Sequence, residues 1–318
     1  MTMRIAMTGG RGFIGRHVVQ CLIGAGYGVR LGTRRSHALA GTEQSLIDLR
    51  QPSDEAFARL LDGCDLLIHL AGIIDDEMDM QSVHVEGTEA LARAAFDRGI
   101  AMIHISSCGV YGPRRDGVLT ETSQFNPVGP YEATKADGEC RVLKAAEERQ
   151  GRLIILRPAI IYGEDMPNDS VRSLIGAVRN RRFVYIGPPG ATYNLIHVDD
   201  VAQAILLAAQ TLLDAGKTPT QQSYNLSDCY EFDTLIPFVA DLLNMPAPRR
   251  RIPLGIARLI AGAGALLPRF PLTSSRVQAL SGRARYDATA IADDLGWRPR
   301  VTMQAGMTRF VNAMETER

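Results

Sequence analysis

The chain has 318 residues, enough for one large α/β domain or two smaller ones with a buried core. Basic and acidic residues both number 35, so the net charge is zero and nothing favours a nucleic-acid-binding protein. The five cysteines are far apart without a CxxC pair, which predicts buried thiols in a reducing compartment and no metal site. Without a signal-peptide-like start or an integral membrane segment, a cytoplasmic protein is expected.

Short apolar runs alternate with amphipathic stretches along the first two-thirds of the chain. This pattern predicts an α/β domain with a doubly wound parallel sheet and helices on both faces. The predicted strands are 3–8, 28–33, 44–48, 65–70, 101–106 and 152–157, and residues 194–227 are expected to return to the sheet. After residue 160, proline and glycine become frequent, which predicts a smaller, mainly helical lobe. We therefore predict a dinucleotide-binding domain over 1–160 plus about 194–227, and a substrate-binding lobe over about 161–193 and 228–318.

The first predicted strand runs directly into the glycine-rich segment GGRGFIG. Gly9, Gly12 and Gly15 there allow a tight turn, close approach of the backbone to a pyrophosphate and close helix–strand packing. The following helix, with Phe13 and Ile14 in its first turn, offers free N–H groups and a positive dipole end to phosphates. The segment therefore predicts a nicotinamide dinucleotide site.

The second predicted strand ends in Thr33-Arg34-Arg35, without the carboxylate that would hold the ribose hydroxyls of NAD. The two guanidiniums can bind a 2′-phosphate, and Arg11 in the glycine loop can join them. This favours NADP(H) over NAD(H), whereas the alternative is that all three arginines are solvated surface residues. Asp48, with Leu49 beside it, is expected at the end of the third strand near the adenine.

The segment PYEATKADGE places Tyr131 and Lys135 one turn apart at the start of a helix predicted over 129–149. A free phenol has a pKa near ~10, too high for a base at neutral pH. A neighbouring ammonium and a positively charged nicotinamide ring would lower that pKa toward the working range. Tyr131 is therefore the predicted acid–base residue, and Lys135 is its predicted partner and a ligand of the ribose hydroxyls.

With these motifs, the sequence resembles the extended short-chain dehydrogenases/reductases, the group of nucleotide-sugar epimerases, dehydratases and reductases. The resemblance covers nearly the whole chain in the family's order, with TGGRGFIG at 8–15, HLAG at 69–72, SSCGVYG at 106–112, YEATK at 131–135, RPAIIYG at 157–163, HVDDVAQA at 197–204 and LGWRP at 295–299. It implies a Rossmann sheet of about seven strands, a C-terminal substrate lobe and a homodimer. It makes Ser107, four residues before Tyr111, the active serine. It also adds Leu70, Ala71, Gly72 and Pro158 to the expected cofactor contacts.

Three departures from the family pattern narrow the expected reaction. Dehydratases of the family resemble one another in a Thr-Asp-Glu turn where this chain has Ser107, Cys108 and Gly109, so elimination of water is disfavoured. Cys108 is expected to be a small buried residue. His84 stands where the family often has asparagine, and it either organises the backbone near the site or packs within a helix. The Arg-Pro-Gly-Asp stretch of many UDP-sugar epimerases is missing, which leaves Arg276, Arg283 and Arg285 as diphosphate ligands or as surface residues.

The leading hypothesis is an NADP(H)-dependent oxidoreductase or epimerase that moves a hydride to or from a carbinol carbon of a nucleotide-activated sugar. The alternative substrate is a hydrophobic alcohol or ketone of the steroid or dihydroflavonol type. A hypothesis of another class is a non-catalytic, cofactor-binding assembly subunit. The apolar stretch 254–267 is expected to pack on the lobe, or else to form a wall for a hydrophobic substrate or a membrane-surface contact. His197, Asp199 and Asp200 are expected to be structural, with the aspartates capping a helix.

Overall fold

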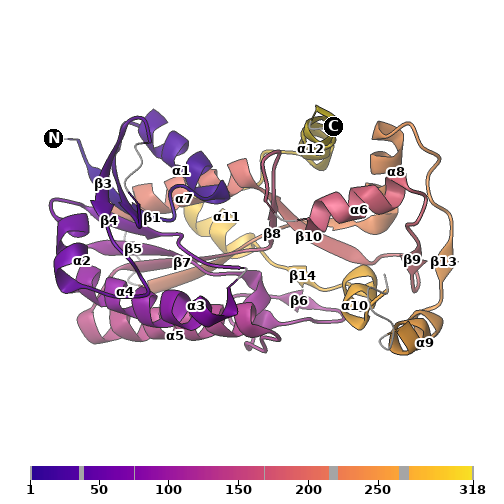
Figure 1. Cartoon of the computed structure of the whole chain (residues 1–318), viewed down its shortest axis with the longest axis horizontal. Helices are drawn as coiled ribbons and strands as arrows, with labels where there is room; N and C mark the ends of the chain where they lie inside the picture. The colour runs from indigo at the N-terminus through magenta and orange to yellow at the C-terminus, as the bar shows by residue number, and fades with distance from the viewer. Residues whose placement is uncertain are drawn as a thin grey trace.

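The computed structural model describes residues 2–35, 39–74, 76–167, 169–214, 221–264 and 272–316. Figure 1 shows an elongated molecule in which a central sheet with flanking helices forms one end and a lobe of short helices and strands forms the other.

The central sheet has seven parallel strands in the order β11-β7-β5-β4-β1-β2-β3, which confirms the predicted Rossmann fold. Its strands are β1 (Arg4–Thr8), β2 (Gly28–Thr33), β3 (Thr42–Leu46), β4 (Leu66–His69), β5 (Ala101–Ile105), β7 (Leu153–Pro158) and β11 (Gln221–Leu226). Since β2 and β3 lie on one side of β1 and the later strands on the other, the order in which strands are added reverses beside β1. Ligands of open α/β sheets bind at this point, outside the carboxyl ends of the strands.

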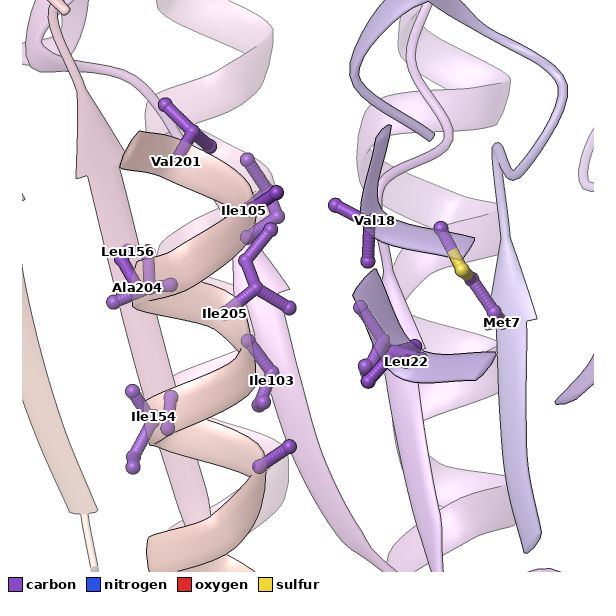
Figure 2. Close-up of a cluster of buried hydrophobic side chains, with 14 of the residues drawn as sticks. Met7, Val18, Leu22, Ile103, Ile105, Ile154, Leu156, Val201, Ala204 and Ile205 are labelled. Atoms are coloured by element: carbon purple, nitrogen blue, oxygen red, sulfur yellow. The ribbon is translucent and has the colours of Figure 1, made fainter. Parts of the chain in front are cut away.

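Helices cover both faces of the sheet because successive side chains of each strand point to opposite faces. On one face, Ile103 and Ile105 of β5 pack with Ile205 of α7, and Figure 2 shows these side chains beside those of α1. On the other face, Met102 packs with residues of α2, α4 and α5, including Phe57. The helices of this half are α1 (Phe13–Gly24), α2 (Asp54–Leu61), α3 (Glu77–Gln81), α4 (Thr88–Phe96), α5 (Pro130–Arg149), α7 (Val198–Leu213) and α11 (Thr289–Leu295), with the π-helix η1 (Ser82–Gly87) and the 3-10 helix η2 (Cys108–Tyr111).

The remaining described elements build the lobe. Its helices are α6 (Ser170–Arg179), α8 (Phe232–Leu242), α9 (Leu254–Gly264), α10 (Ser274–Ser281) and α12 (Met303–Thr316). Three small sheets join β8 (Ile160–Tyr162) to β10 (Thr192–His197) and β12 (Asp228–Glu231), β9 (Tyr185–Ile186) to β13 (Arg251–Ile252), and β6 (Val118–Leu119) to β14 (Arg285–Tyr286). Of the 194–227 segment, β11 therefore joins the central sheet and α7 packs on it, whereas β10 lies in a separate sheet. The two-domain division by residue number stays a proposal.

Two sequence expectations need correction. The third strand lies two residues earlier than expected, over Thr42–Leu46, and Asp48 follows it in a loop. The five cysteines are free, but Cys64 and Cys108 alone are buried, and Cys140 is exposed on α5. None of the described helices is long and apolar enough to cross a membrane.

Candidate active site

A cavity of about 560 Å³ opens at the carboxyl edge of the sheet, beside β1, where the order of the strands reverses. Most of the residues predicted to hold the dinucleotide line it, namely Gly9, Arg11, Gly12, Arg34, Arg35, Asp48, Leu49, Leu70, Ala71 and Gly72. Sequence reasoning missed the lining residues Thr8, Gly10, Gly32, Thr33, Ile47, Arg50, Ile73 and Val83. Most of these residues are next to predicted positions in the sequence. The ends of the predicted strands could therefore have indicated that they line the cavity.

Two positions of the glycine loop require glycine because a side chain there would collide with neighbouring backbone. Gly9 has φ of +75°, and a Cβ there would lie 2.7 Å from the Leu70 carbonyl carbon. A Cβ on Gly15 would lie 2.1 Å from the Gly9 carbonyl oxygen, so the loop and α1 pack closely. Gly12 is the N-cap of α1 and supplies no side-chain cap, which leaves the first N–H groups of the helix for a ligand.

Charged side chains surround the part of the cavity where β2 and β3 end. Arg34 and Arg35 are exposed there, with no acidic residue at the end of β2. Asp48 forms an ion pair with Arg50, whose guanidinium also reaches Asp79. Hydrogen bonding to Arg50 lowers the pKa of Asp48, and the charge of Arg34 adds to this effect. Asp48 is thus an ionised side chain already paired with Arg50.

Phe13, Ile14, Gly15 and Pro158 do not line this cavity. Phe13 is half-buried between His17 and the backbone of Gly163, and Ile14 packs into the core of the sheet. Pro158 is the buried last residue of β7. Tyr131 and Lys135 belong to the neighbouring part of the sheet edge, around β5 and α5.

Ser107 lies just beyond β5 and is the N-cap of η2, where its Oγ accepts a hydrogen bond from the Gly109 N–H at 3.0 Å. The hydroxyl proton therefore stays available to a ligand. A Cβ on Gly109 would lie 3.2 Å from Ser107 Oγ and 2.9 Å from Glu132 Cγ. The turn carrying Ser107 and the first turn of α5, which carries Tyr131, consequently meet at Gly109. Cys108 is a buried thiol that donates to the Arg157 carbonyl, as expected.

The surroundings of Tyr131 differ from the expectation that a lysine lowers its pKa. Burial and the neighbouring Glu132 carboxylate raise the pKa of Tyr131 to about 12 in the protein alone. The ring stands edge-on to the His84 imidazole, with 5.5 Å between ring centroids. Tyr131 is therefore held as a neutral phenol. Glu132 gave no motif signal in the sequence.

Lys135 is buried, and its Nζ donates to the Ile105 carbonyl oxygen at 2.5 Å. Burial lowers the pKa of Lys135 to about 8. Two buried imidazoles, His69 and His104, stack nearby with centroids 5.5 Å apart, and burial and the charge of Lys135 keep both neutral. Lys135 is thus the only cation of this buried group, and β5 fixes its position beneath the site.

His84 is buried within η1 and its imidazole also orders the neighbouring backbone, so the two roles left open by the sequence occur together. Its Nε2 accepts from the Ile73 N–H at 2.9 Å, so Nδ1 carries the proton and donates to Thr134 Oγ1 at 2.9 Å. Burial and Lys135 lower the pKa of His84 to about 4. The neutral imidazole therefore ties the loop that lines the cofactor cavity to the helix of Tyr131 and Lys135.

The HVDDVAQA segment has a structural role that differs in detail from the expected cap. His197, and neither aspartate, caps α7 by accepting from the Asp199 N–H. The buried Asp200 carboxylate instead accepts from the N–H groups of Arg300 and Val301.

Comparison with known proteins agrees with this geometry. Residues 5–226 match the model of the NAD dependent epimerase/dehydratase family. The chain is 29% identical to a 4-hydroxy-2-methyl-3-oxo-4-farnesyl-3,4-dihydroquinoline-1-oxide ketoreductase from Stigmatella aurantiaca, over 96% of this chain and 95% of that protein. It is also 29% identical to sterol demethylase protein B from Methylococcus capsulatus, over 95% and 96% of the two chains.

Among solved structures, the UDP-glucuronic acid 4-epimerase from Bacillus cereus in complex with NAD superposes with a TM-score of 0.76 at 19% identity, over 99% of both chains. At that identity the likeness concerns the fold. The family match, the seven-stranded sheet and the cavity at the glycine loop lead to one conclusion. The chain is an enzyme of the NAD-dependent epimerase/dehydratase family, which binds a nicotinamide dinucleotide.

Proposed function

We propose that this chain is an NADP(H)-dependent oxidoreductase that interconverts an alcohol and a ketone. The observation that carries the proposal is the meeting of the Ser107 turn with the first turn of α5 at Gly109, on the sheet edge that also holds the cofactor cavity. When bound, the nicotinamide would supply or accept the hydride. The side chains would transfer the proton and hydrogen-bond the substrate oxygen.

In the direction of reduction, Tyr131 would donate its proton to the substrate oxygen, for which a neutral phenol is the required state. Ser107 would donate its free hydroxyl proton to the same oxygen. The Lys135 ammonium would hold the ribose and stabilise the phenolate that forms.

For the substrate, we propose a hydrophobic alcohol or ketone. The C-terminal lobe is the part expected to select the substrate, and relatives that align along nearly the whole chain include a farnesyl-dihydroquinoline oxide ketoreductase and a sterol demethylase protein. A nucleotide-activated sugar is the second candidate. Two of the lobe arginines considered for its diphosphate have partners already, because Arg283 donates to the Pro188 and Pro189 carbonyls and Arg285 pairs with Glu231.

A substrate panel tests the reaction and the substrate class. NADPH consumption is measured with a steroid 3-ketone, a dihydroflavonol and a UDP-4-keto sugar. Turnover of either hydrophobic ketone, reduced about 10²- to 10⁴-fold in Tyr131→Phe, is the expected result. Turnover of the sugar alone would favour the second candidate. Turnover of none, or an undiminished rate in Tyr131→Phe, would contradict the mechanism and favour a non-catalytic subunit.

Cofactor titrations test the proposed NADP(H) preference. Replacing Arg34 and Arg35 by alanine should weaken NADP⁺ binding about tenfold or more, because charge-assisted hydrogen bonds to the 2′-phosphate would be lost. NAD⁺ binding should change little, and Arg59→Ala on α2 is the control. Tighter binding of NAD⁺ than of NADP⁺ by the unsubstituted protein would refute the preference.

A further inference from the structure

The charges of this neutral chain are unevenly distributed along the sequence. Two long stretches, 1–42 and 242–286, contain no aspartate or glutamate. The first has six arginines and forms the glycine loop and the end of β2, where a dinucleotide phosphate would explain the positive charge. The second has eight arginines, balanced by a net charge of −8 on the rest of the chain. The proposed function gives this second stretch no anionic partner.

Part of the second stretch satisfies its charges within the lobe. Arg251 pairs with Asp233 and lies over the Tyr185 ring, Arg285 pairs with Glu231, and Arg283 donates to backbone carbonyls. Arg249, Arg250 and Arg258 are different. All three are exposed, and no ion pair or side-chain hydrogen bond joins them to the described part of the chain.

Arg249 and Arg250 precede α9 and Arg258 lies on it, and the outer face of this helix is apolar. One face of α9 packs through Ala257 and Ala261 against Val277 of α10 and Ile186 of β9. On the opposite face, Ile256, Leu259 and Ile260 are 50%, 75% and 37% exposed. The spacing of three and four residues places them on one stripe, with Arg258 at its border. The predicted packing of 254–267 is thus correct for one face of α9, and residues 265–267 lie outside the described residues.

Figure 1 places α9 at the end of the lobe away from the central sheet. Arg249 and Arg250 directly precede the β13 strand that leads into this helix. The molecule therefore has an end where unpaired guanidiniums and a large aliphatic stripe are exposed together. An apolar face with arginines beside it matches the interface of an anionic bilayer, in which the aliphatic side chains enter the acyl boundary and the arginines meet lipid phosphates.

We propose that this end of the lobe, formed by Arg249, Arg250 and α9, is a membrane-binding surface that docks on anionic lipid headgroups. The charge selects an anionic partner. The aliphatic stripe selects one with an accessible hydrocarbon layer, which a dissolved polyanion lacks. The site is separate from Tyr131 and the cofactor cavity, so the binding does not depend on the identity of the substrate.

Co-sedimentation of the full chain with lipid vesicles tests the proposal. The probes are vesicles of phosphatidylcholine alone and of phosphatidylcholine with 30 mol% phosphatidylglycerol, at low and at physiological salt. We expect binding to the anionic vesicles that weakens with salt. Replacing Arg249, Arg250 and Arg258 by glutamine should lower the partition coefficient on the order of 100-fold, at about fivefold for each arginine. Leu259→Ser should lower it at both salt concentrations.

Matched variants elsewhere on the surface distinguish binding at this site from non-specific adsorption to vesicles. Met78→Ser removes an exposed apolar side chain on α3, and Arg59→Gln removes an exposed arginine on α2. Both should bind vesicles as the unsubstituted protein does, and circular dichroism of every variant checks folding. Equal binding to both kinds of vesicle, no binding to either, or equal losses in the control variants would overturn the proposal. So would binding to heparin without binding to vesicles, or a dimer in light scattering that Leu259→Ser dissociates, since a second copy would then cover the stripe.

Discussion

A carboxylate stands directly beside the phenol proposed to move the proton. The Glu132 side chain lies between two glycines, since a Cβ on Gly109 would come within 2.9 Å of its Cγ and a Cβ on Gly129 within 2.7 Å of its Oε2. Both glycines therefore leave the room that this side chain occupies. After burial, the Glu132 charge is the second cause that raises the pKa of Tyr131.

Glu132→Gln should therefore lower the pKa of Tyr131, because it removes a negative charge that opposes formation of the phenolate. Oxidation of an alcohol requires the phenolate, so the pH at half-maximal oxidation rate should move to lower pH. The pH–rate profile with saturating NADP⁺ measures this shift. Glu147→Gln, an exposed glutamate near the other end of α5, is the control and should leave the profile unchanged. A shift to higher pH, or none, would show that Glu132 does not act on Tyr131.

At the scale of elements, a π-helical turn connects the cofactor loop to the helix of the proposed acid–base pair. The π-helix η1 contains His84, and it packs so closely on α5 that a Cβ on Gly138 would lie 2.0 Å from the His84 carbonyl oxygen. Glycine at position 138 is thus required by the close approach of two backbones. The wide turn of a π-helix commonly marks a functional segment, here the one that brings the imidazole to both the loop and α5.

Gly138→Ala should destabilise the protein by about 1–3 kcal/mol, since the added methyl group forces η1 and α5 apart. Gly176→Ala is the matched control on α6, where a Cβ would meet no heavy atom within 4 Å. Alanine favours a helix interior over glycine, so the control should be neutral or stabilise by up to about 1 kcal/mol. Urea unfolding of both variants measures the two free energies. A Gly138→Ala protein as stable as the control protein would mean that η1 can move away without cost.

Local sequence signals explain which elements could be predicted. The inner strands β4, β5 and β7 were visible because they are buried on both faces and read as short apolar runs. The β3 strand was misplaced because Ile47 and Leu49, which follow it in a loop, are as buried as strand residues. The two-residue strands of the lobe, such as β9 and β13, carry no periodicity, since their pairing depends on contacts distant in the sequence.

The candidate site also has a part that could be predicted from local sequence patterns and a part that could not. The glycine loop and the spacing of Tyr131 and Lys135 are local patterns, and the structure brings both to one edge of the sheet. The effect of Glu132 on Tyr131 and the role of His84 depend on packing among α5, η1 and the loop after β4. Glu132 is next to Tyr131 in the sequence, but its effect depends on how deeply α5 buries the phenol, and the contacts of His84 join separate elements, so no spacing within the sequence could have indicated either.

At the scale of the whole molecule, a buried carboxylate holds the C-terminal segment where it passes from the sheet half to the lobe. The α11 helix packs on the sheet and α12 packs in the lobe, and the chain between them passes the start of α7. Here the buried Trp297 donates to the Asp200 carbonyl oxygen at 3.0 Å. The Asp200 carboxylate accepts from the Arg300 N–H at 2.8 Å and from the Val301 N–H at 3.2 Å.

Asp200→Ala should therefore destabilise the whole chain by about 2–5 kcal/mol, because two partly buried backbone donors lose their acceptor. Asp200→Asn keeps one side-chain oxygen as an acceptor and removes a charge whose burial is unfavourable, which is why burial raises the pKa of Asp200. The asparagine variant should lose about 1 kcal/mol or less. Chemical unfolding followed by the fluorescence of Trp297, the single tryptophan, reports on the junction itself. Equal losses in the two variants would indicate that the charge is what matters, whereas a large loss in Asp200→Ala alone would locate the stabilisation in the two hydrogen bonds.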